Sequence, residues 1–392
     1  IMSAAYISGS LLHPLLVALS VKLSIQYGNI EASAFAYSSC GLIFCNFLQD
    51  VDTGVRFGNL GLQVVSKLNG KAAKPEVLTV QGFFILHRKS HIKKTLALVK
   101  EGYAIALEVG NIEFAGHTAF HYCFNSFWRA QLLSKLEQET RIHTNGLMQL
   151  NQVFAANYCR IYWQSILNLQ GITEHYSILS GEALQETEFL PQLIESQDSL
   201  GLFLFYLCKL MLCYLFGEIE SAQNYGIETR KYLIVGTGNF GIPVFYFYDS
   251  LAALAAFNFS TEDTSKVFEQ VEENQAQLQQ QWADYAPMNH QHKVDLVAAE
   301  KHRVLGNKLE AIEFYEKAIA GAKANEYIQE EALANELAAK FYLNWGKEKV
   351  AAVYMQEAYY CYDSWGAKAK TDDLEKHYPQ LLAPILKIQT NS

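Results

Sequence analysis

The chain has 392 residues, of which 50% are hydrophobic and 18% are charged, and its formal net charge is −9. A sequence this apolar can bury a large core, which excludes a disordered chain. The acidic balance argues against nucleic-acid binding, because proteins of that class usually carry a basic surface. With seven prolines in the whole length, long helices are rarely interrupted, and the composition favours an all-helical fold.

The chain opens with Ile1 and the apolar stretch "IMSAAYISGSLLHPLLVALSVKLSIQYGN". An isoleucine start suggests a segment cut from a longer protein. The stretch lacks a basic beginning and runs directly into a helical pattern, so it predicts a helix of the fold and not a secretory signal. None of the seven cysteines forms a Cys-x-x-Cys pair, which indicates buried thiols in a reducing compartment. We therefore expect a cytoplasmic protein.

A phrase of bulky residues, a glycine, polar residues and an alanine-rich amphipathic run recurs along the chain. It occurs as "QYGNIEASAFAY", "LEVGNIEFAGHTAF", "YLFGEIESAQNY", "VLGNKLEAIEFYEKA" and "NWGKEKVAAVYMQEA", with the glycines Gly28, Gly110, Gly217, Gly306 and Gly346. Because glycine readily takes the left-handed conformation that ends a helix, each phrase predicts two antiparallel helices joined by a short turn. Repeated hairpins indicate a helical solenoid.

The spacing between the first two phrases leaves room for one more repeat. Gly28 and Gly110 lie 82 residues apart, about twice the interval seen later in the chain, and Gly58 is a candidate for the intervening turn. Position twelve after Gly110 is Tyr122, a large residue where the repeat favours a small one. The first two thirds of the chain are therefore expected to be a degenerate array.

Two histidine pairs have the i, i+4 spacing that brings side chains together on a helix. These are His87/His91 and His117/His121, with Cys123 near the second pair. Such pairs can bind zinc, but neither contains the glutamate of His-Glu-x-x-His and no third ligand is evident. The charge of "HRKSHIKK" would also oppose a cation. We expect no metal site, and the basic stretch is predicted to be a solvated helix face or a patch that meets an acidic partner.

A polar stretch and a very apolar one follow each other in the middle of the chain. Residues 173–199 are expected to be a connection with a short helix in it. The run "GLFLFYLCKLMLCYLF" (201–216) is shorter than the roughly 20 residues that cross a membrane, and Lys209 lies in its middle. It therefore predicts a fully buried helix and no membrane span.

The run "YLIVGTGNFGIPVFYFYDS" contains Gly236-x-Gly238-x-x-Gly241, the glycine spacing of dinucleotide-binding proteins. In those proteins the glycines follow a strand and open a helix whose N-terminus holds the pyrophosphate. An acidic residue roughly 20 positions on binds the ribose, and Glu262 and Asp263 stand near that distance. An NAD-binding or other small-ligand enzyme is therefore one interpretation.

The surroundings of the glycines favour a different interpretation. No alternation of strands and helices flanks them, and a crowded aromatic run follows Pro243. We therefore expect a loop that leaves a helix end at residues 232–235 and enters the next helix at Pro243. The dinucleotide- or small-ligand-binding enzyme stays as the alternative.

The last third of the chain fits the tetratricopeptide pattern best. Residues 258–287 contain a helix-capping pattern, Ser260-x-x-Asp263, and then a solvated helix. Beyond them Gly306 and Gly346 lie 40 residues apart. Twelve positions after each comes a small residue (Ala318 and Ala358), and directly before each comes a bulky one (Leu305 and Trp345). We expect a divergent helical array over 1–285 and tetratricopeptide-like repeats over 286–385, continuous as one right-handed superhelix.

The stretch "AEKHRVLGNKLEAIEFYEKAIAGAKANEYIQEEALANELAAKFYLNWGKEKVAAVYMQEAYYCYDSWGAKAKTDDLEKHYPQLL" resembles the helical-repeat segment of large bacterial, mainly cyanobacterial, signalling proteins. Proteins of this family carry composite names, either multi-sensor or trifunctional, that combine a serine/threonine-protein kinase, an ATP-binding protein and a sensor histidine kinase. "SIQYGNIEASAFAY", "LCYLFGEIESAQNY" and "PVFYFYDSLAALA" look like earlier parts of the same segment. The resemblance implies a serine/threonine kinase and an AAA-type ATPase before this segment, and a GAF sensor and histidine kinase after it.

No kinase, ATPase, GAF or phosphoacceptor motif of that family falls on this sequence, so no catalytic, cofactor-binding or metal-binding residue is assigned. The expected function is a non-catalytic interaction and signal-relay segment without a cofactor. Its partners would be the adjoining ATPase, GAF and kinase domains, or a signal protein or peptide. A passive structural spacer is the second alternative. The ligand, the binding face and the oligomeric state stay open.

Overall fold

Left-handed glycines separate helices where the sequence predicted hairpin turns. In the computed structural model, which describes residues 2–7, 10–257 and 264–389, Gly28, Gly110, Gly217, Gly306 and Gly346 have φ between 74° and 96°. Each lies one or two residues after one helix ends and two or three residues before the next begins. A Cβ atom would oppose this backbone conformation, so glycine determines where the chain reverses. The predicted turn between two helices is confirmed at all five positions.

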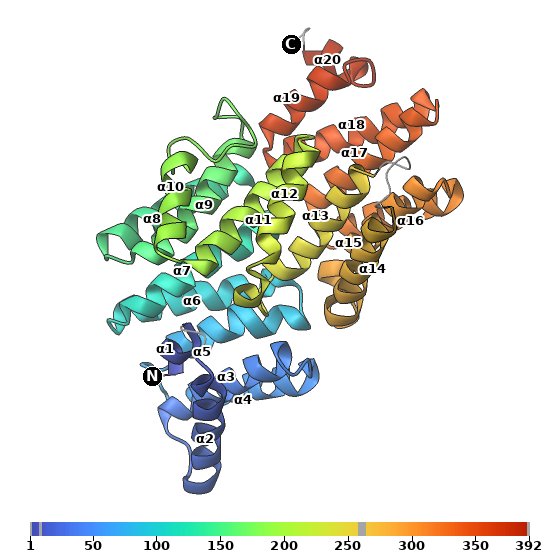
Figure 1. Cartoon of the computed structure of the whole chain (residues 1–392). Helices are drawn as coiled ribbons and strands as arrows, with labels where there is room; N and C mark the ends of the chain where they lie inside the picture. The colour runs from blue at the N-terminus through green and yellow to red at the C-terminus, as the bar shows by residue number, and fades with distance from the viewer. Residues whose placement is uncertain (1, 8–9, 258–263, 390–392) are drawn as a thin grey trace. The chain divides into compact units, whose positions relative to one another are not determined.

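The chain divides into two compact units that are interleaved in sequence. Unit 1 comprises Ile1–Ser126, His143–Ala156 and Thr237–Phe240; unit 2 comprises Phe127–Ile142, Asn157–Gly236 and Gly241–Ser392. The first helices (Figure 1) are α1 (Met2–Ile7), α2 (Leu12–Tyr27), α3 (Glu31–Asn46), α4 (Val51–Lys67), α5 (Lys74–Val80) and α6 (Thr95–Glu108). Between α5 and α6 the chain forms a π-helical turn, η1 (Gln81–Ile85), and two 3₁₀ turns, η2 (Leu86–Arg88) and η3 (Ile92–Lys94). Three longer helices contribute residues to both units: α7 (Ile112–Trp128), α8 (Leu133–Gln149) and α9 (Val153–Leu169).

The remaining helices belong to unit 2 and pack mostly as sequence neighbours. They are α10 (Glu186–Glu195), α11 (Ser199–Leu215), α12 (Ile219–Arg230), α13 (Gly241–Ala255), α14 (Thr264–Leu278), α15 (Pro287–Leu305), α16 (Lys308–Ala324), α17 (Ile328–Asn344), α18 (Glu348–Trp365), α19 (Lys368–His377) and α20 (Ala383–Gln389). The turns η4 (Leu233–Gly236) and η5 (Gln279–Ala283) complete the list. The pairs α11/α12, α13/α14, α15/α16 and α17/α18 are hairpins.

Three glycines, Gly41, Gly54 and Gly61, bring α3 and α4 together in unit 1. A Cβ atom on Gly54 would lie 2.7 Å from the carbonyl oxygen of Gly41, and one on Gly61 would lie 2.7 Å from the carbonyl oxygen of Ala34. The expectation that Gly58 marks a turn is wrong, because Gly58 lies inside α4. Its Cβ would lie 2.4 Å from the Gln81 amide nitrogen, so this glycine serves close packing and not chain reversal.

The core of unit 2 is built around α11. Every residue from Gly201 to Leu215 is buried, which confirms the buried helix predicted there. Among the described residues, no helix is long and apolar enough to cross a membrane. The next inner helix, α13, is buried over nearly its whole length, and the small residues Ala318 and Ala358 are buried in α16 and α18 as expected. The bulky residue before Gly306 is not a core residue, since Leu305 is 44% exposed.

The all-helical prediction is confirmed for the part of the chain that the structure describes. That part contains no β-strand; a single isolated bridge joins Ser180 and Gln185. The predicted capping pair, Ser260 and Asp263, and the acidic candidate Glu262 lie outside the described residues. The right-handed tetratricopeptide superhelix and its division at residue 285 stay predictions.

Candidate functional site

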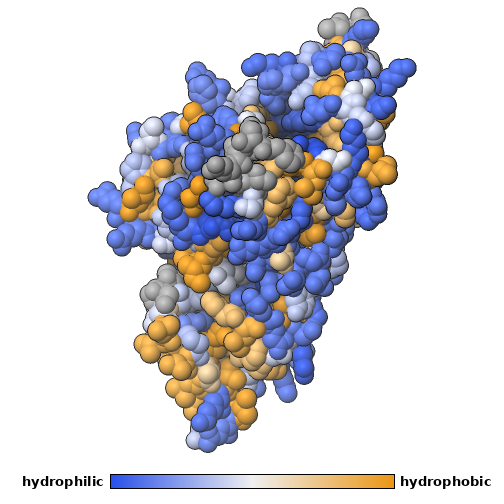
Figure 2. Space-filling view, turned by 45° about the vertical axis from the view of Figure 1, so that its right-hand side comes forward, coloured by the Kyte–Doolittle hydropathy of each residue, from blue (hydrophilic) through white to orange (hydrophobic). Residues whose placement is uncertain are grey.

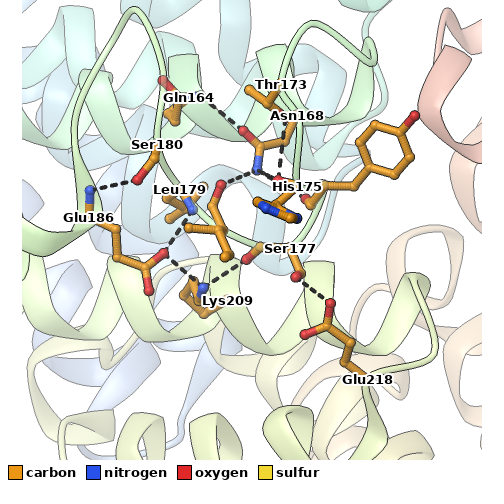
Figure 3. A network of polar contacts seen from close by, with 12 residues as sticks. Gln164, Asn168, Thr173, His175, Ser177, Leu179, Ser180, Glu186, Lys209 and Glu218 are labelled. Atoms are coloured by element: carbon orange, nitrogen blue, oxygen red, sulfur yellow. Dashed lines mark hydrogen bonds and ion pairs between the residues drawn. The ribbon is translucent and has the colours of Figure 1, made fainter.

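The connection between α9 and α10 is the longest stretch of irregular backbone between two helices in the part that the structure describes. It runs over residues 170–185 and contains turns, bends and the bridge between Ser180 and Gln185. The short helix predicted in this region is α10. Long irregular loops are uncommon in compact folds and are frequently functional when they are ordered. Side chains from α9, α10 and α11 hold this one in place (Figure 3).

Two buried amides of α9 bind the backbone of the loop. The Nδ2 atom of Asn168 donates to the carbonyl oxygens of Tyr176 at 3.0 Å and Ile178 at 2.7 Å. The Oε1 atom of Gln164 accepts the Ala183 N–H at 3.0 Å, while its Nε2 atom donates to Asn168 Oδ1 at 2.9 Å. The two amides thus substitute for the regular hydrogen bonds that the loop backbone lacks.

A buried lysine of α11 holds the centre of the loop. Lys209 is 2% exposed; its Nζ atom donates to the Ser177 carbonyl oxygen at 2.7 Å and pairs with Glu186 Oε2 at 2.8 Å. The same carboxylate oxygen accepts the Leu179 N–H at 2.7 Å. The Nζ atom also lies 5.0 Å from the centre of the Tyr225 ring. A carbonyl oxygen and a carboxylate thus compensate the buried ammonium, and Lys209 holds the loop backbone in place.

The loop exposes apolar and charged side chains on a fixed backbone. Ile172 is 66% exposed and Ile178 is 40% exposed, with the exposed Glu174, His175 and Glu182 along the same segment. On α12, the helix of Tyr225, a depression of about 340 Å³ is lined by Ser221, Asn224, Tyr225, Ile227 and Glu228. A rigid loop with isolated apolar anchors and charges around them is typical of a protein-recognition surface.

The glycines of the motif belong to both units, and Gly236 and Gly238 each pack closely against a side chain of their own unit. The residues before the motif form the 3₁₀ turn η4 and not a strand, and α13 begins at Gly241, two residues before the expected Pro243. In unit 2, a Cβ on Gly236 would lie 2.8 Å from the Phe203 ring. In unit 1, Gly238 has φ 85° and its Cβ would lie 2.4 Å from the Asn46 side chain. Neighbouring side chains fill the space that a Cβ atom would need at Gly236 and Gly238, so close packing explains these two glycines. The strand that a dinucleotide-binding fold needs before the glycines is missing at residues 232–235.

The first histidine pair does not lie on one helix face. His87 is in η2 and is fully buried, and its Nε2 atom lies 2.9 Å from the Phe83 carbonyl oxygen. His91 instead precedes η3, where its Nδ1 atom accepts the Lys93 N–H. The predicted solvated helix face is wrong for His87 and for Arg88, which is also buried and donates to Asn46 Oδ1. The lysines of the stretch, Lys89, Lys93 and Lys94, are exposed as expected. Burial, with a smaller effect of the Arg88 charge, lowers the pKa of His87 to about 3.

The second pair does lie on α7, with different environments for the two rings. His121 stacks on Phe83 at a centroid distance of 3.6 Å, and burial lowers its pKa well below 6.5. The Nε2 atom of His117 lies 3.8 Å from Glu113 Oε1. Cys123, which is close to this pair in the sequence, is buried. No group of three potential metal ligands occurs among the described residues.

Sequence reasoning missed most of the loop anchors. Lys209 was noticed only as a charge inside an apolar run, and Asn168, Gln164 and Glu186 were not singled out. A signal was present, since a charged or amide residue inside an otherwise apolar helix must find a partner when the helix is buried. The identity of that partner depends on a loop that crosses from α9 to α10, which sequence spacing does not give.

Over the residues that the structure describes, the chain is all-helical, its helices pack mostly as sequence neighbours, and side chains of three helices anchor the loop at residues 170–185. No family model matches the chain. A stretch of 61 residues, 16% of this chain, is 46% identical to part of hybrid signal transduction histidine kinase G of Dictyostelium discoideum. The matched stretch covers 2% of that protein's length. The tetratricopeptide-like segment of the bacterial kinases stays a resemblance.

Proposed function

We propose that the chain is a non-catalytic interaction and signal-relay segment of a multi-domain kinase. Its context is signal transduction, as in the histidine kinase with which it shares a local similarity. In this proposal it couples a preceding serine/threonine kinase and AAA-type ATPase to downstream GAF sensor and histidine kinase domains in the cytoplasm. It needs no cofactor of its own, and its partners are proteins.

The observation that carries the proposal is the anchored loop at residues 170–185. Its backbone is bound by Asn168, Gln164 and Lys209 before any partner arrives, so little conformational entropy is lost on binding. Its exposed isoleucines, Ile172 and Ile178, supply the apolar contact that a protein partner would bury. The buried amine of Lys209 is used to build the loop, which favours recognition over catalysis.

The test is capture of the domains that flank the segment in the full protein. The wild-type chain is compared with Ile172→Glu and Ile178→Glu, using crosslinking followed by mass spectrometry with and without ATP. Each substitution should lower crosslinking from the loop at least tenfold, because a charge replaces an apolar anchor. Ile142→Glu is the matched control, since Ile142 is 68% exposed on α8.

Two outcomes would contradict the proposal. If the loop crosslinks to no neighbouring domain, or if all three variants behave like wild type, the segment acts as a passive spacer. Circular dichroism and thermal melting of the variants exclude misfolding as the cause of any loss.

A further inference from the structure

The charges around the anchored loop are nearly all negative. Residues 161–229 contain nine Asp or Glu residues and a single Lys or Arg, Lys209, whereas the whole chain carries 40 Asp or Glu and 31 Lys or Arg. Lys209 is buried and holds the loop, so it contributes no exposed positive charge. Four carboxylates of this stretch are exposed and, among the described residues, lie in no ion pair: Glu174, Glu182, Glu188 and Glu220.

The cations at the edges of this stretch are already bound to other groups. Arg160 donates to a loop carbonyl oxygen at 2.7 Å. Lys231 pairs with Glu228 at 2.6 Å, and Lys368, at the start of α19, pairs with Asp372 at 2.6 Å. The loop and the start of α10 therefore present a negative surface that a cationic partner would neutralise.

One buried ammonium connects the loop with the depression on α12. The Lys209 Nζ atom lies 2.7 Å from the Ser177 carbonyl oxygen and 5.0 Å from the centre of the Tyr225 ring, which lines the depression. Figure 3 shows that the Ser177 hydroxyl also points toward Glu218, which accepts its hydrogen bond directly before α12. The loop and the depression thus adjoin each other and are held by buried groups.

Exposed isoleucines lie among these charges. Ile172 and Ile178 are exposed on the loop, and Ile227, which is 60% exposed, lines the depression together with Tyr225. Figure 2 shows a similar pattern on the visible face of unit 2, where hydrophobic side chains form small groups between hydrophilic ones. Apolar contacts surrounded by polar groups are typical of reversible protein interfaces. The surface therefore fits a ligand that combines positive charge with apolar side chains.

We propose that the loop and the α12 depression bind a basic segment of a protein partner, in which Lys and Arg side chains alternate with bulky apolar ones. An apolar side chain enters the depression against Tyr225 and Ile227. The neighbouring cations pair with Glu182, Glu188 and Glu220. Carboxylates spread over a loop and two helices suit an extended polycation better than a single metal ion. Opposite charges steer such a segment to the surface and select it against acidic segments. The inference rests on the proposed function, because it names the class of partner for the same loop.

Fluorescence anisotropy of the intact chain with labelled synthetic peptides tests the proposal. The probe is a peptide in which leucines alternate with pairs of lysines, and we expect a dissociation constant of about 10–100 μM. A peptide with glycine in place of leucine should bind about tenfold more weakly, and one with glutamate in place of lysine should not bind. Raising NaCl from about 0.1 M to about 1 M should weaken binding of the probe about tenfold, because the Debye length shortens from about 10 Å to about 3 Å.

Charge reversal in the chain locates the contact. Glu182→Lys and Glu188→Lys should each weaken binding of the probe about three- to tenfold, because an attraction becomes a repulsion. Glu348→Lys is the matched control, since Glu348 is also an exposed carboxylate in the first turn of a helix and lies in no ion pair among the described residues. It should bind the probe like wild type, and all variants should keep the wild-type circular dichroism spectrum. Equal losses in the control, equal binding of the leucine and glycine peptides, or no binding of the probe at about 1 mM overturns the proposal.

The crosslinking test of the proposed function separates this inference from the function itself. The expected result is a crosslink from the loop to a segment rich in Lys and Arg. If the loop crosslinks to a flanking domain through a segment without Lys or Arg, the proposed function stands and this inference falls. If the loop crosslinks to no neighbouring domain while the basic peptide binds as expected, the surface recognises a basic segment of another protein, and the relay function falls.

Discussion

Substitution of Gly54 by alanine tests the close packing of α3 and α4. The new Cβ would lie 2.3 Å from Cys45 Sγ, 2.7 Å from Cys45 N and 2.7 Å from the carbonyl oxygen of Gly41. Two of these three atoms belong to the α3 backbone and cannot rotate away. Ordinary contact begins at 3.4 Å, so α4 must retreat from α3 by at least 3.4 − 2.7 = 0.7 Å.

That displacement weakens the packing along the whole pair of helices. A radial gap of 0.5–1 Å loses a quarter to a half of each dispersion contact, and overpacking of this kind costs about 1–3 kcal/mol. Because the obstruction is backbone, we take the upper end, about 3 kcal/mol. Alanine returns about 1 kcal/mol through its higher helix propensity. The net expectation is a destabilisation of about 2 kcal/mol.

Hydrogen exchange of the α3 and α4 amides is the appropriate assay, since a chain of two units does not unfold in one two-state step. A loss of about 2 kcal/mol accelerates exchange through local opening about 30-fold. Gly146→Ala in α8 is the matched control, because its Cβ would meet nothing closer than Tyr103 Oη at 3.8 Å. It should slow exchange in α8 by up to about fivefold. Equal effects of the two substitutions, or unchanged exchange in α3 after Gly54→Ala, would refute the packing argument.

Three further measurements follow from the buried polar groups. Acidification from pH 7 to pH 5 should lower the free energy of unfolding of unit 1 by about 2 kcal/mol through His87, whose folded-state pKa is about 3, and His121 should act in the same direction. Burial lowers the folded-state pKa of both rings, so the unfolded chain takes up protons at a higher pH than the folded chain does. In urea titrations His121→Phe should reduce the loss of stability between pH 7 and pH 5, and an unchanged loss would contradict the argument. Lys209→Met should destabilise the loop by about 3 kcal/mol, because Glu186 and the Ser177 carbonyl oxygen lose the cation that they bind. Hydrogen exchange at residues 175–185 should become faster, and exchange as slow as in wild type would contradict the role of Lys209 as an anchor. A thiol reagent at pH 8 should label Cys40 before the six buried cysteines, and rapid labelling of several native thiols would contradict their burial.

The hairpin turns were predictable because the signal for a turn is local. Glycine takes a positive φ at no steric cost, so Gly28 and Gly306 mark their turns in the sequence itself. Turns in which another residue has positive φ, such as Ala130 and Glu326, carry no such mark. The burial of residues 201–215 was also predictable from the local sequence. An apolar run that is too short to span a membrane is expected to be buried in the protein core.

The failures concern residues whose role is set by distant neighbours. Gly58 looks like a turn glycine, but its small size is needed because Gln81, more than twenty residues later, packs against it. The stretch around His87 reads as a polar helix face, yet Arg88 is buried because it bonds Asn46 from another helix. In the anchored loop, Lys209 bonds a carbonyl 32 residues away in the chain. Periodicity reports on one helix at a time and does not encode these pairs.

Long-range side-chain bonds also distinguish unit 2 from an ideal solenoid. Gln329 donates to the Trp128 carbonyl oxygen at the end of α7, 201 residues away, and Lys370 donates to the Leu215 carbonyl oxygen at the end of α11, 155 residues away. Trp365 donates to the Gln131 carbonyl oxygen across 234 residues. Helix-terminal carbonyls have no partner within their own helix, so α17 and α19 satisfy acceptors that α7 and α11 leave open.

In a simple repeat array each hairpin contacts only its neighbours, and a local change decays along the stack. Here a shift of α19 would uncover the end of α11, the helix whose Lys209 holds the anchored loop, because Lys370 donates to α11 and Lys209 belongs to it. Mechanical coupling of this kind is what a relay requires and what a spacer does without. Lys370→Met, which removes the bond to α11 while Lys209 is kept, should therefore accelerate hydrogen exchange at residues 175–185 as well as in α19. Acceleration confined to α19 would show that the C-terminal end of α11 and its Lys209 are independent, and that the segment does not relay through this helix.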